Sequence, residues 1–279
     1  MCSRCLSLVL LAGPLFAAGP GTLRVCADPN NLPFSNERGE GFENRLAKLV
    51  ADDMGSKLEF VWWGPRKGLV KNSLDEDRCD VLMDVPASLG SVSATTPYYR
   101  STYVFVSRQD RHLHISSLND ERLAKWRIGI HIVGNDYAPP AWVLSRRGLS
   151  ANVAGYSLFG AYGEQDPPAR LIDAVVAGDV DVAIVWGPLA GYFAQHSKTP
   201  LEVTPVSPQN YLTVPFVFEM AMGVQKGNDR LLAALNQALQ RRCADVQAVL
   251  HDYGVPLVPG GEGKQSCDAS RLSPAALLH

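Results

Sequence analysis

The sequence has no strong excess of either charge, and beyond its first twenty residues it has no apolar run long enough to cross a membrane. Lys and Arg total 26 against 28 Asp and Glu, a formal net charge of −2. A nearly balanced charge argues against nucleic acid or an anionic membrane as the partner. The motifs G-x-S-x-G and H-E-x-x-H are also missing, so no common hydrolase signature is present.

The first twenty residues have the composition of a signal peptide. Arg4 precedes the apolar run Leu6–Ala18 (LSLVLLAGPLFAA), which is too short for a transmembrane span, and small residues follow it. We therefore expect residues 1–20 to be removed on export, leaving a periplasmic protein with no transmembrane anchor.

Cysteine is scarce in the expected mature chain. Cys2 and Cys5 spell C-x-x-C but lie in the signal peptide, so we assign them no redox or metal role. The remaining even number favours disulfides in an exported protein, with free buried thiols as the alternative. Of the three connectivities that four cysteines allow, we favour one bond between adjacent strands and one that holds the C-terminal tail: Cys26–Cys79 and Cys243–Cys267.

Strand and helix signals alternate along the chain, which predicts βαβ units and an α/β fold with mostly parallel sheets. The pattern indicates two similar halves. The strand at 218–224 resembles the strand at 99–106, and antiparallel pairing of these two would return the chain from the second half to the first. We predict lobe 1 from residues 22–108 plus 209–258, lobe 2 from 109–208, and a loop-like tail at 259–279. The expected strands are 23–27, 58–62, 80–83, 99–106, 126–132, 153–158, 181–185, 201–206 and 218–224; the expected helices are 42–54, 66–74, 139–147, 169–177, one opening at 187 and a long or broken one over 229–253.

Two segments, 23–35 and 79–106, each begin as an apolar strand and break into a loop rich in Pro, Asn and Ser. Neighbouring parallel strands of open α/β sheets bind ligands at their carboxyl ends. Each loop residue could instead serve as a helix cap or turn residue. The residues that we expect to line the cleft are Asp28, Asn30, Asn31, Phe34, Trp63, Arg66, Asp84, Ser88, Tyr98, Tyr99, Gly134, Asn135, Tyr137 and Trp186.

Several stretches resemble a known family. The order of the first strand, the CDV strand, TTPYY, VFVSR and AMGVQKGNDRLLAALNQAL is similar to type II periplasmic solute-binding proteins. Within them, RVCADPNNLPFSN, RCDVLMDVPAS, GNDYAPPAWVLSRRG and DVAIVWGPLAGYFA look like the MxaJ/XoxJ proteins associated with PQQ-dependent methanol dehydrogenase. The resemblance implies a two-lobed clamshell, each lobe a sheet flanked by helices, joined by two crossover strands.

The resemblance also shows a departure from amino-acid-binding relatives. Those proteins place an Arg before the PYY strand, whose planar fork takes the ligand carboxylate in two parallel bonds. Residues 86–96 contain no Arg, and the Asp that meets the ligand ammonium is replaced by Trp186. An aromatic side chain suits an apolar or larger partner group, so an α-amino acid ligand is disfavoured. Arg66 and Arg100 are the candidates for a substitute anchor, and Arg66 is the better one because Arg100 alternates away from Tyr99 in a regular strand.

Three functions remain open. The resemblance implies a non-catalytic accessory protein that binds the methanol dehydrogenase or a segment of it, with the dehydrogenase's cytochrome c as a further candidate partner. An ABC-transporter solute-binding protein for a small non-amino-acid ligand is the alternative. An enzyme on this scaffold would need an acid/base pair, for which Asp28, Glu43 and Asp84 are the candidates. We expect no cofactor and no metal, because His112-x-His114 lacks a third ligand nearby.

Overall fold

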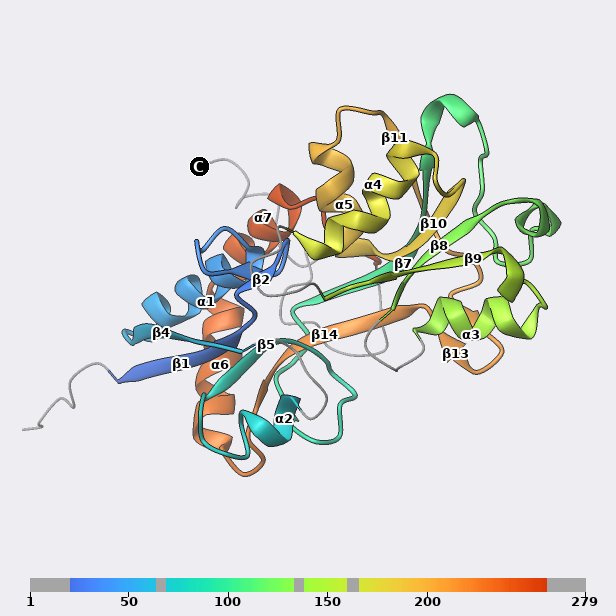
Figure 1. Cartoon of the computed structure of the whole chain (residues 1–279). Helices are drawn as coiled ribbons and strands as arrows, with labels where there is room; N and C mark the ends of the chain where they lie inside the picture. The colour runs from blue at the N-terminus through green and yellow to red at the C-terminus, as the bar shows by residue number, and fades with distance from the viewer. Residues whose placement is uncertain (1–20, 64–68, 133–137, 160–165, 260–279) are drawn as a thin grey trace, which may run out of the picture.

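The computed structural model describes residues 21–63, 69–132, 138–159 and 166–259. Its centre is a ten-stranded mixed sheet with the strand order β4-β1-β5-β14-β7-β10-β8-β9, in which β6 pairs with β14 and β11 with β7. Helices flank this sheet in both halves (Figure 1). The strands are β1 (Thr22–Ala27), β2 (Asn30–Asn31), β3 (Ser35–Asn36), β4 (Lys57–Trp62), β5 (Val81–Pro86), β6 (Ser93–Ala94), β7 (Tyr99–Arg108), β8 (Ile128–Ile132), β9 (Val153–Ser157), β10 (Val182–Trp186), β11 (Leu201–Pro205), β12 (Asn210–Tyr211), β13 (Val214–Pro215) and β14 (Val217–Val224).

The helices follow the strands in alternation, as the sequence predicts. They are α1 (Phe42–Asp53), α2 (Leu69–Asn72), α3 (Pro139–Arg146), α4 (Arg170–Ala177), α5 (Gly187–His196), α6 (Asp229–Arg241) and α7 (Cys243–Asp252), with the 3-10 helices η1 (Gln109–Arg111), η2 (Glu121–Lys125), η3 (Ser150–Asn152) and η4 (Pro167–Ala169). The predicted C-terminal helix is broken in two at Arg242, where α6 ends and α7 begins. Of the helix expected over 66–74, residues 66–68 lie outside the described residues, α2 covers Leu69–Asn72, and residues 73–74 form a turn instead of continuing the helix.

Helix α1 shows how local sequence places the first half. Its apolar spacing puts Phe42, Leu46 and Val50 on one buried face. Asn44 in its first turn accepts the N–H of Gly41 through Oδ1 at 3.0 Å, which satisfies a backbone donor at the helix start. The helix ends where Gly55 takes a left-handed φ of 63°. The start of α1 is thereby fixed beside the loop that follows β1.

Strands β7 and β14 run through both halves and connect them (Figure 1). The first part of β7 pairs antiparallel with β14, from Thr102 opposite Val217 to Tyr99 opposite Met220. The rest of β7 pairs antiparallel with β10 and β11, while β14 continues alongside β5. The antiparallel pairing expected for these two strands is therefore confirmed. The lobe boundaries stay predictions.

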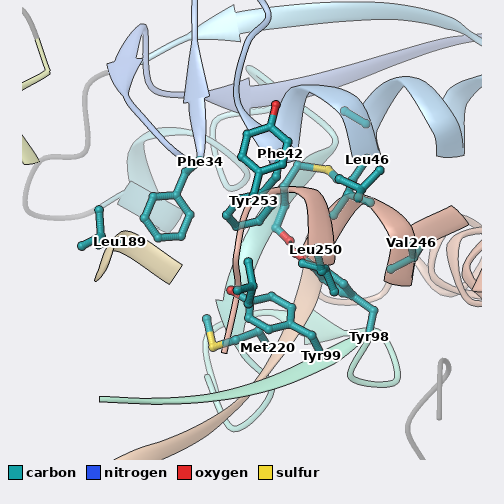
Figure 2. Close-up of a cluster of buried hydrophobic side chains, with 14 of the residues drawn as sticks. Phe34, Phe42, Leu46, Tyr98, Tyr99, Leu189, Met220, Val246, Leu250 and Tyr253 are labelled. Carbon is teal, nitrogen blue, oxygen red and sulfur yellow. Dashed lines mark hydrogen bonds between the residues drawn. The ribbon is translucent and has the colours of Figure 1, made fainter. Parts of the chain in front are cut away.

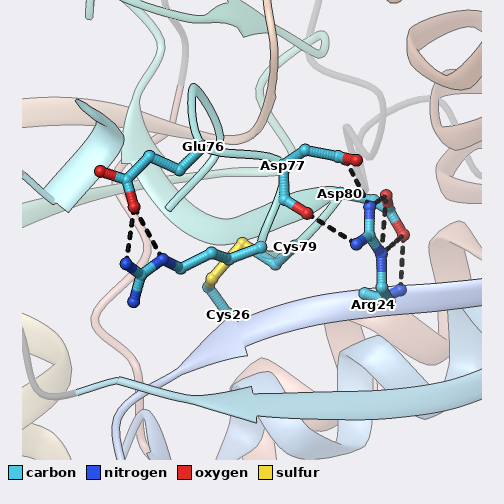
Figure 3. The surroundings of a disulfide bond; sticks show 7 residues. Arg24, Cys26, Glu76, Asp77, Cys79 and Asp80 are labelled. Atoms are coloured by element: carbon cyan, nitrogen blue, oxygen red, sulfur yellow. Dashed lines mark hydrogen bonds and ion pairs between the residues drawn. A yellow bond between two sulfur atoms is a disulfide. The ribbon is translucent and has the colours of Figure 1, made fainter. Parts of the chain in front are cut away.

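The disulfide between Cys26 and Cys79 is confirmed. It joins β1 to the residue two positions before β5, with a Cα–Cα distance of 5.5 Å. Beside it, the Arg24 guanidinium contacts Asp80 at 2.7 Å and Asp77 at 2.6 Å (Figure 3). Cys243 is buried at the start of α7, whereas Cys267 lies outside the described residues, so their pairing stays a prediction.

One hydrophobic core extends from the first half into the second. It includes Val25 and Leu46 from the first half together with Leu171 and Val185 from the second. Figure 2 shows Leu189 of α5 beside Phe34, which precedes α1. Near the same place, the rings of Tyr192 in α5 and Tyr253 after α7 stack with centroids 5.6 Å apart.

No helix in the described part of the chain is long and apolar enough to cross a membrane. The signal peptide predicted for residues 1–20 lies outside the described residues.

Candidate functional site

A cavity of about 330 Å³ lies between the two halves of the molecule. The first half contributes the carboxyl ends of β1 and β5 and the first turn of α1; the second contributes the ends of β8 and β10 and the starts of α3 and α5. This is the edge at which open α/β sheets bind ligands. The lining residues are Cys26, Ala27, Asp28, Asn31, Phe34, Ser35, Glu43, Trp63, Leu82, Met83, Asp84, Val85, Tyr103, His131, Ala138, Pro140, Leu158, Phe159, Ile184, Trp186 and Leu189.

An aromatic cluster forms the wall where β7 meets β10. Trp186 lies opposite Tyr103 in the strand register, and their ring centroids are 5.4 Å apart. Phe218 of β14 packs edge-on against both rings, at 5.8 Å from Trp186 and 6.4 Å from Tyr103. Trp186 also starts α5, with Pro188 in the first turn of that helix. The indole is thus held by both a strand pairing and a helix start.

Three carboxyl groups line the cavity from the first half. Asp28 follows β1 and accepts the backbone N–H of Asn30 through Oδ1 at 2.8 Å. Asp84 of β5 accepts the hydroxyl of Tyr99 at 2.8 Å. The carboxyl group of Glu43, in the first turn of α1, makes no hydrogen bond or ion pair within the described residues, although the backbone N–H of Glu43 donates to the carbonyl oxygen of Phe34 at 2.9 Å. No lysine or arginine lines the cavity in the part of the chain that the structure describes.

Burial of this acidic wall raises the pKa of each carboxyl. Desolvation raises the pKa of Asp84 to about 7, although the hydroxyl of Tyr99 partly opposes the shift. Desolvation also raises the pKa of Glu43 well above its usual range, and the nearby charges of Asp84 and Asp28 raise it further. The pKa of Asp28 is raised by burial and lowered by the N–H of Asn30. The wall therefore carries less negative charge near neutral pH than three free carboxylates would.

His131 brings the second half's titratable group to the cavity. Its Nε2 lies 3.1 Å from the carbonyl oxygen of Pro168, so the Nε2–H tautomer can donate to that oxygen. Burial lowers the pKa of His131 to about 4, which keeps the ring neutral at pH 7. Among the described residues, no group of three or more His, Cys, Asp or Glu side chains could hold a metal ion.

The structure brings six of the predicted cleft residues to the cavity: Asp28, Asn31, Phe34, Trp63, Asp84 and Trp186. Arg66, Gly134, Asn135 and Tyr137 lie outside the described residues.

The structure places the other four predicted residues away from the cavity lining. Tyr98 and Tyr99 are core residues, 0% and 1% exposed, whose hydroxyls donate to the carbonyl of Met83 and to Asp84 behind the cavity wall. Asn30 supports Asp28 instead of lining the cavity. Ser88 is exposed in the turn after β5, away from the lining.

Several lining residues of the second half were not predicted from the sequence. His131 is next to the last residue of β8, so the rule that ligands bind at strand ends could have indicated it, whereas Ile184 lies in the middle of β10. Tyr103 shares a strand face with Tyr99 because side chains alternate along β7. Leu158 and Phe159 follow β9 and carried no signal beyond their apolar character.

Comparison with known proteins defines the class. The model for bacterial extracellular solute-binding proteins, family 3, matches residues 23–252. The chain belongs to this family, and the predicted two-lobed α/β architecture is confirmed by its solved relatives.

Particular relatives share a narrower likeness. The protein MoxJ of Methylorubrum extorquens is 35% identical over 252 residues, covering 86% of this chain and 82% of that protein. The crystal structure of MxaJ from Methylophaga aminisulfidivorans has a TM-score of 0.75 at 29% identity, and that of the periplasmic binding protein XoxJ from Methylobacterium extorquens has 0.69 at 36%. Each comparison covers 85% of this chain and 100% of the solved one. The predicted resemblance to MxaJ/XoxJ proteins is confirmed.

Proposed function

We propose that this protein is a periplasmic, non-catalytic accessory of a PQQ-dependent methanol oxidation system, and that its cavity binds the dehydrogenase or a segment of it to aid activation or maturation. The likeness to MoxJ, MxaJ and XoxJ over most of the chain supports the assignment to that system. The observation that carries the binding mode is Trp186, which stands in the aromatic wall where amino-acid-binding relatives are expected to place a carboxylate.

The chemistry of the cavity agrees with this assignment. An α-amino acid needs a donor for its carboxylate, and the described lining offers neither lysine nor arginine. Packed aromatic rings instead supply a large apolar contact area at little entropy cost. Sites that bind an anchoring side chain of a partner protein are built in the same way. The dehydrogenase's cytochrome c is a further candidate partner.

A pull-down tests the assignment. Tagged mature protein should retain the apo-dehydrogenase from the same organism, and Trp186→Ala should weaken retention because it removes the central indole of the cavity wall. Trp142→Ala is the matched control, since Trp142 is 36% exposed and lies outside the cavity lining. The proposal is contradicted if the unaltered protein does not associate with the dehydrogenase and a deletion strain keeps its dehydrogenase activity unchanged.

Delivery of a small solute to an ABC permease is the second candidate, favoured by the cavity's volume. About 330 Å³ falls at the lower end of the range for small-molecule sites. A thermal-shift screen with polar metabolites and PQQ decides between the two, because a ligand that binds the folded state raises the melting temperature by mass action. A large shift with one solute, and no dehydrogenase retention, would favour transport.

A further inference from the structure

The cavity combines an acidic wall in the first half with an aromatic wall in the second. Asp28, Glu43 and Asp84 line the first, and Trp186 with Tyr103 lines the second. Glu43 is the informative member, because its partly buried carboxyl group lines the cavity and has no hydrogen-bond or ion-pair partner among the described residues. Its described charged neighbours are the two other carboxyls.

The described lining supplies no positive charge to balance this acidic wall, and such a wall is costly. Removing carboxylates from water disfavours their charged form, and each like charge nearby adds repulsion. The guanidinium of Arg78 lies over the ring of Trp63, with its Cζ 4.7 Å from the ring centroid. It forms an ion pair with Glu76 at 2.6 Å and does not line the cavity, so it does not balance the acidic wall. A positive group entering the cavity would offset the desolvation and the repulsion together.

The opposite wall suits the same group. Aromatic faces attract cations, most strongly at tryptophan, and they also pack well against a methylene chain. A negatively charged ligand group would meet the acidic wall with no cationic anchor in the described lining.

We propose that the cavity binds a protonated amine or guanidinium on an apolar stem that carries no carboxylate of its own, with the charge at Asp28, Glu43 and Asp84 and the stem against Trp186. Lysine and arginine side chains inside a polypeptide have this chemistry, as do free alkylamines. The inference rests on the proposed function in one respect, since a polypeptide source would be a segment of the partner protein.

Titration calorimetry on the full mature protein at pH 8 and low salt tests the chemistry. The probes are Nα-acetyl-lysine amide, its neutral counterpart Nα-acetyl-norleucine amide, n-butylamine and calcium chloride. Loss of a charged hydrogen bond lowers affinity roughly 10- to 100-fold, so the norleucine compound should bind weaker than the lysine compound by about that factor. Tighter binding of the lysine compound than of n-butylamine identifies a polypeptide source, and equal binding identifies a free amine.

Variants locate the site. Glu43→Gln and Asp84→Asn should each weaken binding of the lysine compound by roughly 10- to 100-fold, while the exposed carboxylate variant Glu59→Gln, outside the cavity, should leave it unchanged. Circular dichroism of each variant shows that it is folded. Equal affinity for the lysine and norleucine compounds, binding of calcium alone, or full binding by both cavity variants overturns the inference.

The result of the calorimetry can be distinguished from the result of the pull-down with the dehydrogenase. If the unaltered protein retains the dehydrogenase but binds no amine probe, this inference fails and the proposed function stands. If it binds the lysine compound but retains no dehydrogenase, and the deletion strain keeps its dehydrogenase activity, the proposed function fails and the cation site stands.

Discussion

At the scale of single residues, the chemistry of the cavity depends on where charge is absent as much as where it is present. Trp186 occupies a position where amino-acid-binding relatives are expected to have a carboxylate, and Asp84 adds a carboxyl on the opposite side of the same cavity. The sequence predicted Asp84 as a lining residue from the end of its strand, and it predicted Trp186 from the resemblance to amino-acid-binding relatives. It could not predict that Asp84 would receive the hydroxyl of Tyr99, because that contact depends on how β5 and β7 are brought together by β14.

Asp84 makes stability depend on pH in a direction opposite to that of a paired carboxylate. Its pKa of about 7 in the folded protein lies above its usual value of 3.8, so the folded state binds more protons between these pH values. The stabilisation is complete below the usual pKa and is lost as pH rises through 7. Burial causes the shift in the pKa of Asp84, and the hydroxyl of Tyr99 opposes it. Glu43, Asp28 and neutral His131 line the same cavity.

We expect Asp84→Asn to remove this dependence while Asn Oδ1 still accepts the Tyr99 hydroxyl. Urea unfolding between pH 4 and 8 should show the stability of the unaltered protein falling relative to the variant by on the order of a few kcal/mol as pH rises. Comparing the two proteins cancels titrating groups that do not interact with Asp84, including His131, whose lowered pKa acts in the opposite sense. The difference also contains the change at Glu43, whose pKa the charge of Asp84 raises. A constant difference across this range contradicts the assigned burial of Asp84.

At the scale of elements, the helices and strands whose patterns depend on residues close together in the sequence were predicted well. The spacing of Phe42, Leu46 and Val50 predicted α1, and the apolar character of 99–106 and 218–224 predicted the β7–β14 pairing. Short pairings such as β12 with β13 span two residues each and have no periodicity to detect. Tyr98 and Tyr99 were misplaced because alternation tells which residues share a face of a strand, but not which face the neighbouring helices cover.

The Cys26–Cys79 disulfide covalently links β1 to the start of β5, the two strands of the first half whose carboxyl ends line the cavity. It closes a loop with a sequence separation of 53 residues, which in the loop-entropy model stabilises the folded state by about 4 kcal/mol. We expect the double substitution Cys26→Ala and Cys79→Ala to lower the free energy of unfolding by that order, measured by urea denaturation.

The matched control compares the double variant with the unaltered protein when both are kept under a reductant, so that any bond between Cys243 and Cys267 is open in both samples. Both samples should lose similar stability, because Cys26 and Cys79 are buried and each alanine leaves little empty volume. If the double variant is as stable as the oxidised protein, the bond contributes nothing to the rigidity of the β1–β5 wall.

At the scale of the whole molecule, the two halves are held together by packing as well as by the strands that cross between them. The core residues of α1 and α7 continue into those of α4 and α5. The tightest backbone approach is between Gly191 of α5 and Gly254 after α7, where a Cβ on residue 191 would lie 1.9 Å from the carbonyl oxygen of Gly254. Sequence patterns predicted the two halves but not this contact. Its two glycines are far apart in the chain, and they approach closely because neither has a side chain.

We expect Gly191→Ala to separate α5 from the segment after α7, because the atom it strikes is backbone and cannot rotate away. Overpacking of this kind costs about 1–3 kcal/mol, and in a protein of this size each kcal/mol lowers the melting temperature by roughly 2–4 °C. Calorimetry measures the loss, and near-ultraviolet circular dichroism reports the stacked pair Tyr192 and Tyr253 beside the contact. Gly90→Ala is the control, since nothing lies within 4 Å of its added Cβ. An unchanged melting temperature for Gly191→Ala would mean that the halves can shift apart at this contact without cost, as a clamshell with a freely opening hinge would do.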